Sequence, residues 1–192
     1  MRTSSAPALS SFENDVAALH ASSFGWAMAC CDRDADLASD VLQQAYFKVF
    51  SGKATFDGRS SLRTWLFGVI RLTALESRRY RVLRLFWGRA PKEDPAQGAG
   101  KPHKPDDDPV AEAPSPSASL AERQRAEAIE AALAKLPPRQ REVLHLTFYE
   151  GLTVREAAEI MGISLGSASV HYERGKSRMS ELLRESGHHE RP

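Results

Sequence analysis

A proline-rich, acidic segment divides this chain and limits what each part can fold into. Residues 89–118 hold seven of the eleven prolines and almost no large apolar side chain. Such a composition cannot bury enough apolar surface to offset the entropy lost on ordering the chain. We therefore predict a flexible linker between two small domains, residues 10–88 and 119–186, whose stability must come from helix packing.

The periodicity of both predicted domains is helical. In the first domain, Leu37, Val41, Ala45 and Val49 recur at helical spacing within DADLASDVLQQAYFKVF. No segment alternates apolar and polar residues over the length of a strand. The sequence therefore predicts an all-α fold in two domains.

Composition excludes several classes of protein. With 42% hydrophobic and 27% charged residues, the chain is typical of a globular protein. No apolar run approaches the roughly 18 residues of a membrane span, and the amino terminus lacks the pattern of a signal peptide. We therefore expect a cytoplasmic protein without membrane insertion.

The sequence offers little catalytic chemistry. It contains no phosphate-binding loop, paired-carboxylate site, nucleophile with a base or cluster of metal ligands. The adjacent Cys30 and Cys31 suit neither a disulfide framework nor a zinc site with four spaced ligands. We predict a protein that is not an enzyme and has no cofactor or metal, with the two cysteines on a helix and at least one of them buried. A redox- or metal-sensing role for the pair is the alternative.

The charge of the chain is unevenly distributed. From Arg71 to Arg89 there are six arginines against one acid, whereas Lys92 to Glu112 contains three lysines against six acids. The formal net charge of +1 is therefore a cancellation of two opposite blocks. A basic block with interleaved aromatics indicates a nucleic-acid surface, and a solvated helix face is its alternative.

The second domain carries the pattern of a helix-turn-helix. Thr153 is placed to cap one helix, Gly162 to make the turn and Ser164 to cap the next helix. In that second helix an inward stripe is expected at Leu165, Ala168, Tyr172, Gly175 and Met179. This geometry suits a helix that enters the DNA major groove, and a hairpin packed against protein is the alternative reading.

The outward face of the second helix carries the candidate DNA contacts. The first turns of such a helix contact base edges, and its flanks contact phosphates. We therefore divide the candidate residues into two groups. Ser164, Ser167, Ser169 and His171 are the predicted base contacts, and Arg174, Lys176 and Arg178 are the predicted phosphate contacts.

Both domains resemble a known family. LPPRQREVLHLTFYEGLTVREAAEIMGISLGSASVHYERGKSRMSELL is similar to region 4 of the extracytoplasmic-function sigma factors, the small sigma-70-type specificity subunits of bacterial RNA polymerase. DADLASDVLQQAYFKVF, followed by ATFDGRSSLRTWLFGVIRLTALESRR, resembles their region 2. The resemblance implies a sigma factor that binds core polymerase and helps to open promoter DNA. Its implied partners are a coiled coil of the largest polymerase subunit, the polymerase flap, promoter DNA and an anti-sigma factor.

The resemblance also implies roles for residues of the first domain. The polymerase coiled coil would contact the helix that contains Asp36, Asp40, Gln43, Gln44 and Phe47. The melted minus-10 strand would lie on a loop and the helix that follows, and region 4 would read the minus-35 element. The candidate minus-10 contacts are Phe56, Asp57, Arg59, Ser60, Arg63, Trp65, Arg71, Arg78 and Arg79. Polar edges, stacking rings and cations suit an unpaired strand, although Trp65 is equally typical of an ordinary core tryptophan.

The sequence departs from the family pattern in two ways. Leu72 stands where the family usually has a polar residue, often asparagine, and Ser169 and His171 stand where basic residues are usual. Both changes reduce the direct contacts expected at the promoter. The alternative function is therefore a helix-turn-helix regulator that binds DNA independently of polymerase.

Overall fold

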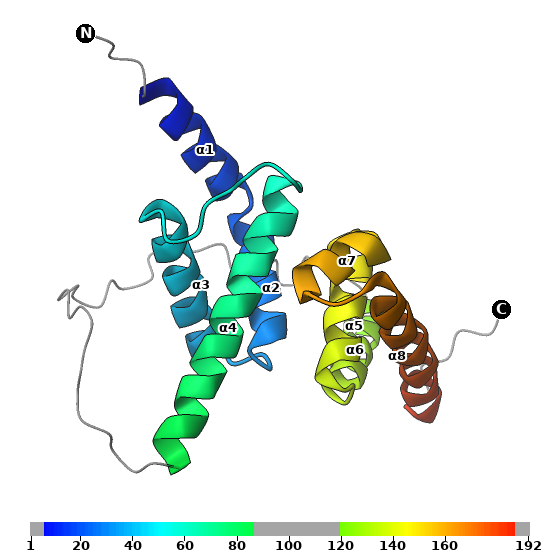
Figure 1. Cartoon of the computed structure of the whole chain (residues 1–192). Coiled ribbons are helices and arrows are strands. Elements are labelled where there is room, and N and C mark those ends of the chain that lie inside the picture. Colours follow the sequence, from blue (N-terminus) through cyan, green and yellow to red (C-terminus); the bar gives the residue numbers. More distant parts are fainter. Residues whose placement is uncertain (1–5, 87–119, 187–192) are drawn as a thin grey trace, which may run out of the picture.

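The computed structural model describes residues 6–86 and 120–186, and within these two ranges every regular element is helical (Figure 1). The prediction of an all-α fold is thus confirmed. The predicted linker, residues 89–118, lies outside the described residues. None of the described helices is long and apolar enough to cross a membrane.

Four helices form the N-terminal unit. Their bounds are α1 (Ala6–Ala18), α2 (His20–Cys30), α3 (Ala35–Phe50) and α4 (Leu62–Phe86). Asp34 caps α3 by accepting a hydrogen bond from the amide of Leu37, and Ser61 accepts one from the amide of Thr64 in the first turn of α4. Helices α2, α3 and α4 pack on one another around a shared apolar core.

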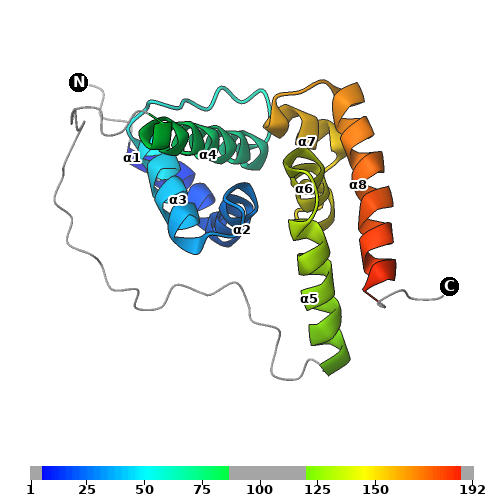
Figure 2. The ribbon, with the colours of Figure 1, turned by 90° about the horizontal axis from the view of Figure 1, so that it is seen from below.

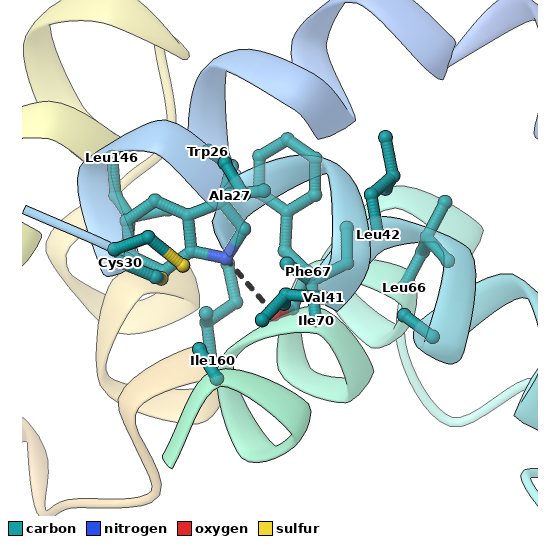
Figure 3. Packing of buried hydrophobic residues seen from close by; sticks show 14 of the residues in the cluster. Trp26, Ala27, Cys30, Val41, Leu42, Leu66, Phe67, Ile70, Leu146 and Ile160 are labelled. Atoms are coloured by element: carbon teal, nitrogen blue, oxygen red, sulfur yellow. Dashed lines mark hydrogen bonds between the residues drawn. The ribbon is translucent and has the colours of Figure 1, made fainter. Parts of the chain in front are cut away.

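Trp26 lies at the centre of this core. Its side chain is fully buried on α2, and its indole nitrogen donates a hydrogen bond to the carbonyl oxygen of Phe67 at 3.0 Å (Figure 3). The rings of Trp26 and Phe67 stack with centroids 6.0 Å apart. A buried indole needs an acceptor for its N–H group, so this bond sets the distance between α2 and α4.

Five helical segments form the C-terminal unit. Their bounds are α5 (Leu120–Ala134), α6 (Pro138–Leu144), the π-helical turn η1 (His145–Tyr149), α7 (Val154–Met161) and α8 (Leu165–Glu185). Pro138 occupies the first turn of α6, where its missing N–H group would have no helical partner in any case. Helix α8 crosses α6 where Gly175 meets Leu144, and an added Cβ at Gly175 would lie 3.2 Å from that leucine.

The two units pack against each other. Helices α6 and α7 lie beside α2 and α4 (Figure 2). Val143, Leu146, Ala157 and Ile160 of the C-terminal unit belong to the same buried cluster as Trp26 of the N-terminal unit. One continuous apolar core therefore spans both halves of the described chain.

Candidate nucleic-acid interface

The helix-turn-helix forms as the sequence predicts. Thr153 and Glu156 make a capping box at the start of α7, in which the threonine hydroxyl accepts the Glu156 amide proton and the glutamate accepts the Thr153 amide proton. Gly162 turns the chain with φ of 61°, and the hydroxyl of Ser164 caps α8 by accepting the amide proton of Ser167 at 3.2 Å. The buried Ala157 and Ala158 leave room for the close approach of α7 to its neighbours.

The inward stripe of α8 is confirmed except at its first member. Ala168 and Gly175 are buried and Tyr172 and Met179 are half-buried, whereas Leu165 is 43% exposed. Leu165 lies ten residues, or about 15 Å of helix, before the crossing at Gly175. The expectation that Leu165 faces inward is therefore wrong, because the tip of α8 extends beyond the closest packing.

The predicted reading face of α8 is open to solvent. Ser164, Ser167, Ser169, Arg174, Lys176 and Arg178 are exposed, and His171 is half-buried. Some of these groups already have partners within the helix. Ser169 donates its hydroxyl proton to the carbonyl oxygen of Leu165, and Arg178 pairs with Glu181 at 2.8 Å. Lys176 pairs with Glu173 at 3.2 Å and lies over the ring of Tyr172.

An aromatic surface is formed by the loop before α4 and the first turn of α4. The ring of Phe56 lies 5.4 Å from that of Trp65, which also contacts Phe12. Phe56 is 38% exposed and Trp65 is half-buried, so this pair combines packing with an accessible ring face. The neighbouring Asp57 forms an ion pair with Arg59 at 3.2 Å, and Ser60 is half-buried.

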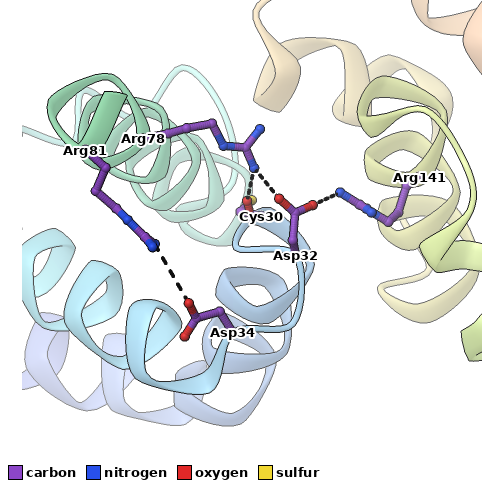
Figure 4. A network of polar contacts seen from close by, with 6 residues as sticks. All are labelled: Cys30, Asp32, Asp34, Arg78, Arg81 and Arg141. Carbon is purple, nitrogen blue, oxygen red and sulfur yellow. Dashed lines mark hydrogen bonds and ion pairs between the residues drawn. The ribbon is translucent and has the colours of Figure 1, made fainter. Parts of the chain in front are cut away.

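Three of the four arginines predicted to contact the minus-10 strand from α4 have partners within the chain. Arg71 pairs with Glu142 of α6 at 3.0 Å, and Arg63 pairs with Glu150 after η1. Arg78 donates to Asp32 at 3.0 Å and to the carbonyl oxygen of Cys30 at 3.1 Å (Figure 4). Arg79 is exposed, as is Leu72. The arrangement therefore places Arg79 at the surface but keeps Arg71 buried.

Glu150 is the most enclosed carboxylate of these pairs. Its side chain is 9% exposed and faces Arg63 of α4 and His145 of η1. Burial opposes ionisation, but hydrogen bonds and charge from His145 and Arg63 outweigh it, and the pKa of Glu150 is lowered from its usual value. Glu150 is thus held as the anion between two cationic or proton-donating groups.

Both cysteines are buried at the end of α2. Burial raises the pKa of Cys30 well above its usual value, with a further contribution from Glu142, and raises that of Cys31 to about 11. Both thiols are free. Among the described residues, no three His, Cys, Asp or Glu side chains gather into a possible metal site.

The predicted polymerase contacts lie on the open face of α3. Asp36, Asp40, Gln43, Gln44 and Phe47 are all exposed. Phe47 is 58% exposed, and the ammonium group of Lys53 lies over its ring at 4.9 Å. An exposed aromatic ring among carboxylates and amides is a surface suited to a protein partner.

An apolar groove opens on the C-terminal unit. It has a volume of about 660 Å³ and lies between α5, the α6–η1 segment and α8. Its apolar lining includes Ile129, Leu133, Leu144, Phe148, Met179 and Leu183. The groove gives this unit a second surface, which adjoins the predicted reading face of α8 at Lys176.

Sequence reasoning missed the residues that join the two units. These include Asp32, Arg33, Glu130, Arg141, Glu142, His145 and Glu150. Their local sequence carries no clear signal, since Glu142 follows Arg141 on a short helix and could equally face solvent. Only the packing of α6 on the N-terminal unit makes them interface residues.

The fold and its exposed surfaces define a two-unit, all-helical protein of the helix-turn-helix DNA-binding class. The description "Sigma-70 region 2" matches residues 17–83, and "Sigma-70, region 4" matches residues 126–179. The chain belongs to the extracytoplasmic-function sigma factors of RNA polymerase. It is a transcription initiation factor that directs promoter-specific transcription by core RNA polymerase.

Individual relatives support this membership. The chain is 30% identical to the ECF RNA polymerase sigma factor EcfG of Rhodopseudomonas palustris, over 78% of this chain and 73% of EcfG. It is 26% identical to the RNA polymerase sigma factor YlaC of Bacillus subtilis, over 81% of this chain and 83% of YlaC. These relatives do not favour the alternative of a polymerase-independent regulator.

Solved structures share the fold. The sigma factor RpoE of Bartonella quintana, in complex with the anti-sigma factor NepR, matches with a TM-score of 0.64 and 23% identity, over 91% of this chain and 97% of RpoE. CnrH, in complex with the cytosolic domain of CnrY, matches with a TM-score of 0.57 and 21% identity, over 91% of this chain and 88% of CnrH.

Proposed function

We propose that three surfaces of this sigma factor each bind a different ligand during initiation. The exposed face of α3 binds core polymerase, the surface around Phe56 and Trp65 with the arginines of α4 holds the minus-10 strand, and α8 reads the minus-35 duplex. The observation that carries the proposal is the presence of all three on one chain, each with chemistry suited to its ligand. Residues 10–88 and 119–186 are the corresponding domains.

At α8, serines and a histidine replace long cations at the positions nearest the bases. Hydroxyl groups discriminate weakly between bases, whereas a bidentate arginine-to-guanine contact contributes about 1 to 3 kcal/mol of discrimination. The exposed Arg174, Lys176 and Arg178 lie about two and a half to four turns into the helix and supply the phosphate contacts. We therefore propose a modest minus-35 contact, with promoter affinity shared with polymerase and with the N-terminal unit.

At the N-terminal unit, Phe56 and Trp65 provide ring faces on which an unpaired base can stack. Stacking on an aromatic side chain contributes about 1 to 3 kcal/mol per base. The exposed Arg79 can bind the phosphate backbone of the minus-10 strand directly. Arg63, Arg71 and Arg78 can do so once they leave their present partners. The exposed Leu72 offers the strand an apolar contact in place of a hydrogen bond.

The remaining assignments follow from membership in the family. We propose that the chain performs no catalysis itself and acts in the cytoplasm, where RNA polymerase is found. The two solved relatives are bound to NepR and to CnrY, and NepR is named as an anti-sigma factor. We propose that this chain likewise has an inhibitory protein partner. The polymerase flap is the proposed occupant of the apolar groove on the C-terminal unit.

Reconstituted transcription tests the proposal. Promoters are first selected from a random DNA library with holoenzyme made from this chain and core polymerase. His171→Ala should then change the preferred minus-35 bases and leave core binding intact, whereas Ser177→Ala, at an exposed position of α8, should change neither. Loss of core binding in His171→Ala would show that α8 faces the polymerase and not the DNA.

Core binding is tested separately on α3. Phe47→Ala should weaken core binding roughly 10-fold, as truncation of an aromatic anchor does at protein interfaces. Asp40→Asn should also weaken it, whereas Asp15→Asn, which removes an exposed charge from α1, should not. Equal affinity of all these variants for core polymerase would place the docking surface elsewhere.

A further inference from the structure

We propose that the contact between the two units is an autoinhibitory latch. In the closed form, Glu142 and Glu150 of the C-terminal unit occupy two arginines of α4 that would otherwise bind the minus-10 strand. Promoter DNA and these carboxylates therefore compete for the same guanidinium groups. This inference rests on the proposed assignment of Arg63, Arg71 and Arg78 to the minus-10 strand.

Two ion pairs join arginines of α4 directly to the C-terminal unit. Arg71 donates through Nε to Glu142 at 3.0 Å, and Arg63 donates to Glu150. A carboxylate accepts hydrogen bonds from a guanidinium group much as a phosphate does. Because a guanidinium group held in such a pair is not free to bind a nucleotide phosphate, closure lowers affinity for the strand at two positions.

A third contact runs through the turn between α2 and α3. Asp32 accepts hydrogen bonds from Arg78 of α4 and from Arg141 of α6, and so ties both units to one carboxylate (Figure 4). Asp32 and its neighbour Arg33 both have positive φ, of 54° and 64°. This backbone conformation is unfavourable for most residues other than glycine, and arginine tolerates it less well than aspartate does. Arg33 also pairs across the interface, with Glu130 of α5 at 3.3 Å.

The strained turn and the ion pairs are therefore coupled. The turn aims Asp32 at Arg141, and the interdomain bonds of Asp32 and Arg33 help to hold the turn. Opening the interface would release this strain and remove Arg141 from Asp32. A strained element that is held by contacts across an interface is suited to a two-state device.

Apolar packing makes the closed form stable enough to be populated. The ring of Trp26 lies 5.5 Å from that of His145, and Val143, Leu146 and Ile160 share the core with Ile70. The polar part of the interface is less complete. The Nε atoms of Arg63 and Arg141 are buried without a hydrogen-bond acceptor among the described residues. Unpaired buried donors cost free energy, which opening to solvent would recover.

The test removes the two anions of the C-terminal unit without changing side-chain shape. The variant Glu142→Gln/Glu150→Gln is compared with Glu127→Gln/Glu159→Gln, which removes the same charge from exposed positions of α5 and α7. Closure is read by energy transfer between dyes on Ser39→Cys of α3 and Ser180→Cys of α8, both exposed. Strand affinity is read by fluorescence anisotropy with the single-stranded minus-10 non-template sequence of a promoter selected with holoenzyme.

We expect the interface variant to lose energy transfer and to bind the single strand roughly 5-fold or more tightly than the wild type, as for a coupled two-site equilibrium. The control variant should keep the energy transfer and change the affinity by less than about twofold. Unchanged energy transfer in the interface variant would overturn the latch. Lost energy transfer without a gain in affinity would do so as well.

A milder variant covers the case in which the double variant does not fold. Asp32→Asn changes an exposed side chain, 59% accessible, and weakens only the bridge from Arg78 to Arg141. Like the double variant, it should lower energy transfer and raise strand affinity, but both changes should be smaller. The opposite direction, or no change in either, would contradict the latch.

A further substitution separates failure of the latch from failure of the proposed minus-10 site. In the opened background, Arg71→Ala should reverse most of the gain in strand affinity. If energy transfer and affinity both respond to opening but Arg71→Ala has no effect, the interface is a latch that does not act through this arginine, and the stated competition is wrong. If holoenzyme itself fails to bind the strand, the proposed minus-10 site is wrong, whatever the state of the interface.

Discussion

The guanidinium Nε of Arg71 lies 3.0 Å from Oε2 of Glu142, in a pair whose side chains are 9% and 12% exposed. Arg71 belongs to α4 and Glu142 to α6, so the pair joins the two halves of the protein. A buried ion pair adds little net stability, because desolvation offsets the attraction, but removal of one partner leaves the other charge unpaired. The pair is therefore better suited to specifying one arrangement of the units than to stabilising either unit alone.

Replacement of Trp26 tests the apolar centre of this arrangement. Trp26→Phe removes the hydrogen bond to Phe67 and leaves unfilled space beside His145. We expect a loss of about 1 to 3 kcal/mol in the free energy of unfolding, from the unpaired carbonyl and the smaller ring. Urea denaturation followed by circular dichroism measures it. Trp65→Phe, at a half-buried position, is the control and should cost less; an equal loss would mean that Trp26 is not the central residue.

Two glycines of the helix-turn-helix should respond to alanine in opposite directions. Gly162 has φ of 61°, where a side chain is strained whatever the space around it, so Gly162→Ala should destabilise the unit by about 1 kcal/mol. Gly166 lies in the first turns of α8, and nothing lies within 4 Å of an added Cβ. Gly166→Ala should therefore stabilise the protein by up to about 1 kcal/mol through helix propensity. Thermal unfolding of both variants measures these shifts, and shifts of the same sign would refute the turn geometry.

Acid should weaken the contribution of Glu150 to stability. Because the folded-state pKa of Glu150 lies below its unfolded value, its stabilising effect is complete above the usual glutamate range and disappears as pH falls through the lowered pKa. The groups that face it are Arg63 and His145. Urea midpoints measured from about pH 6 to pH 3 should fall more for the wild type than for Glu150→Gln. Parallel curves would show that this carboxylate does not couple to folding.

The wild type must be compared with Glu150→Gln because the pKa of Glu156 is lowered as well. Its carboxylate accepts hydrogen bonds from Thr153 in the capping box, and its pKa is lowered for this reason. Acid therefore weakens the start of α7 as well. Because both proteins in the comparison retain Glu156, the difference between the two curves isolates Glu150.

The cysteine pair should be slow to react. Since burial raises the pKa of Cys31 to about 11 and that of Cys30 well above its usual value, little thiolate forms near neutral pH. A thiol reagent at about pH 8 should react at least roughly 100-fold more slowly with the native protein than with an exposed cysteine introduced by Ser39→Cys. Rapid modification of Cys30 or Cys31 in the folded protein would instead support the redox-sensing alternative.

Local sequence chemistry predicted the secondary structure well. The caps at Thr153 and Ser164, the turn at Gly162 and the proline start of α6 are all present, because each depends on residues within one helical turn. The exposure of the α3 and α8 candidate residues, except the half-buried His171, was also predicted, since apolar periodicity assigns opposite faces to core and solvent. Leu165 failed this rule because periodicity does not reveal where a helix extends beyond its neighbours.

The packing of the two units was not predictable in the same way. The sequence predicts Arg63, Arg71 and Arg78 as contacts to the minus-10 strand, and only the fold shows that they have carboxylate partners. Arg71 and Glu142 are 71 residues apart, and no local pattern marks either one as buried. The π-helical turn that places His145 against Trp26 also lacks a distinct sequence signature.

The amino-acid sequence by itself determined the helices, their caps, the helix-turn-helix and the family, because these depend on short-range chemistry and on the order of a few motifs. Only the tertiary structure decided which charged side chains are available to a ligand. The physical reason is that burial and charge pairing are properties of surfaces brought together from distant parts of the chain. Arg79 and Arg71 belong to one basic block in the sequence, yet one faces solvent and the other is paired with Glu142 inside the protein.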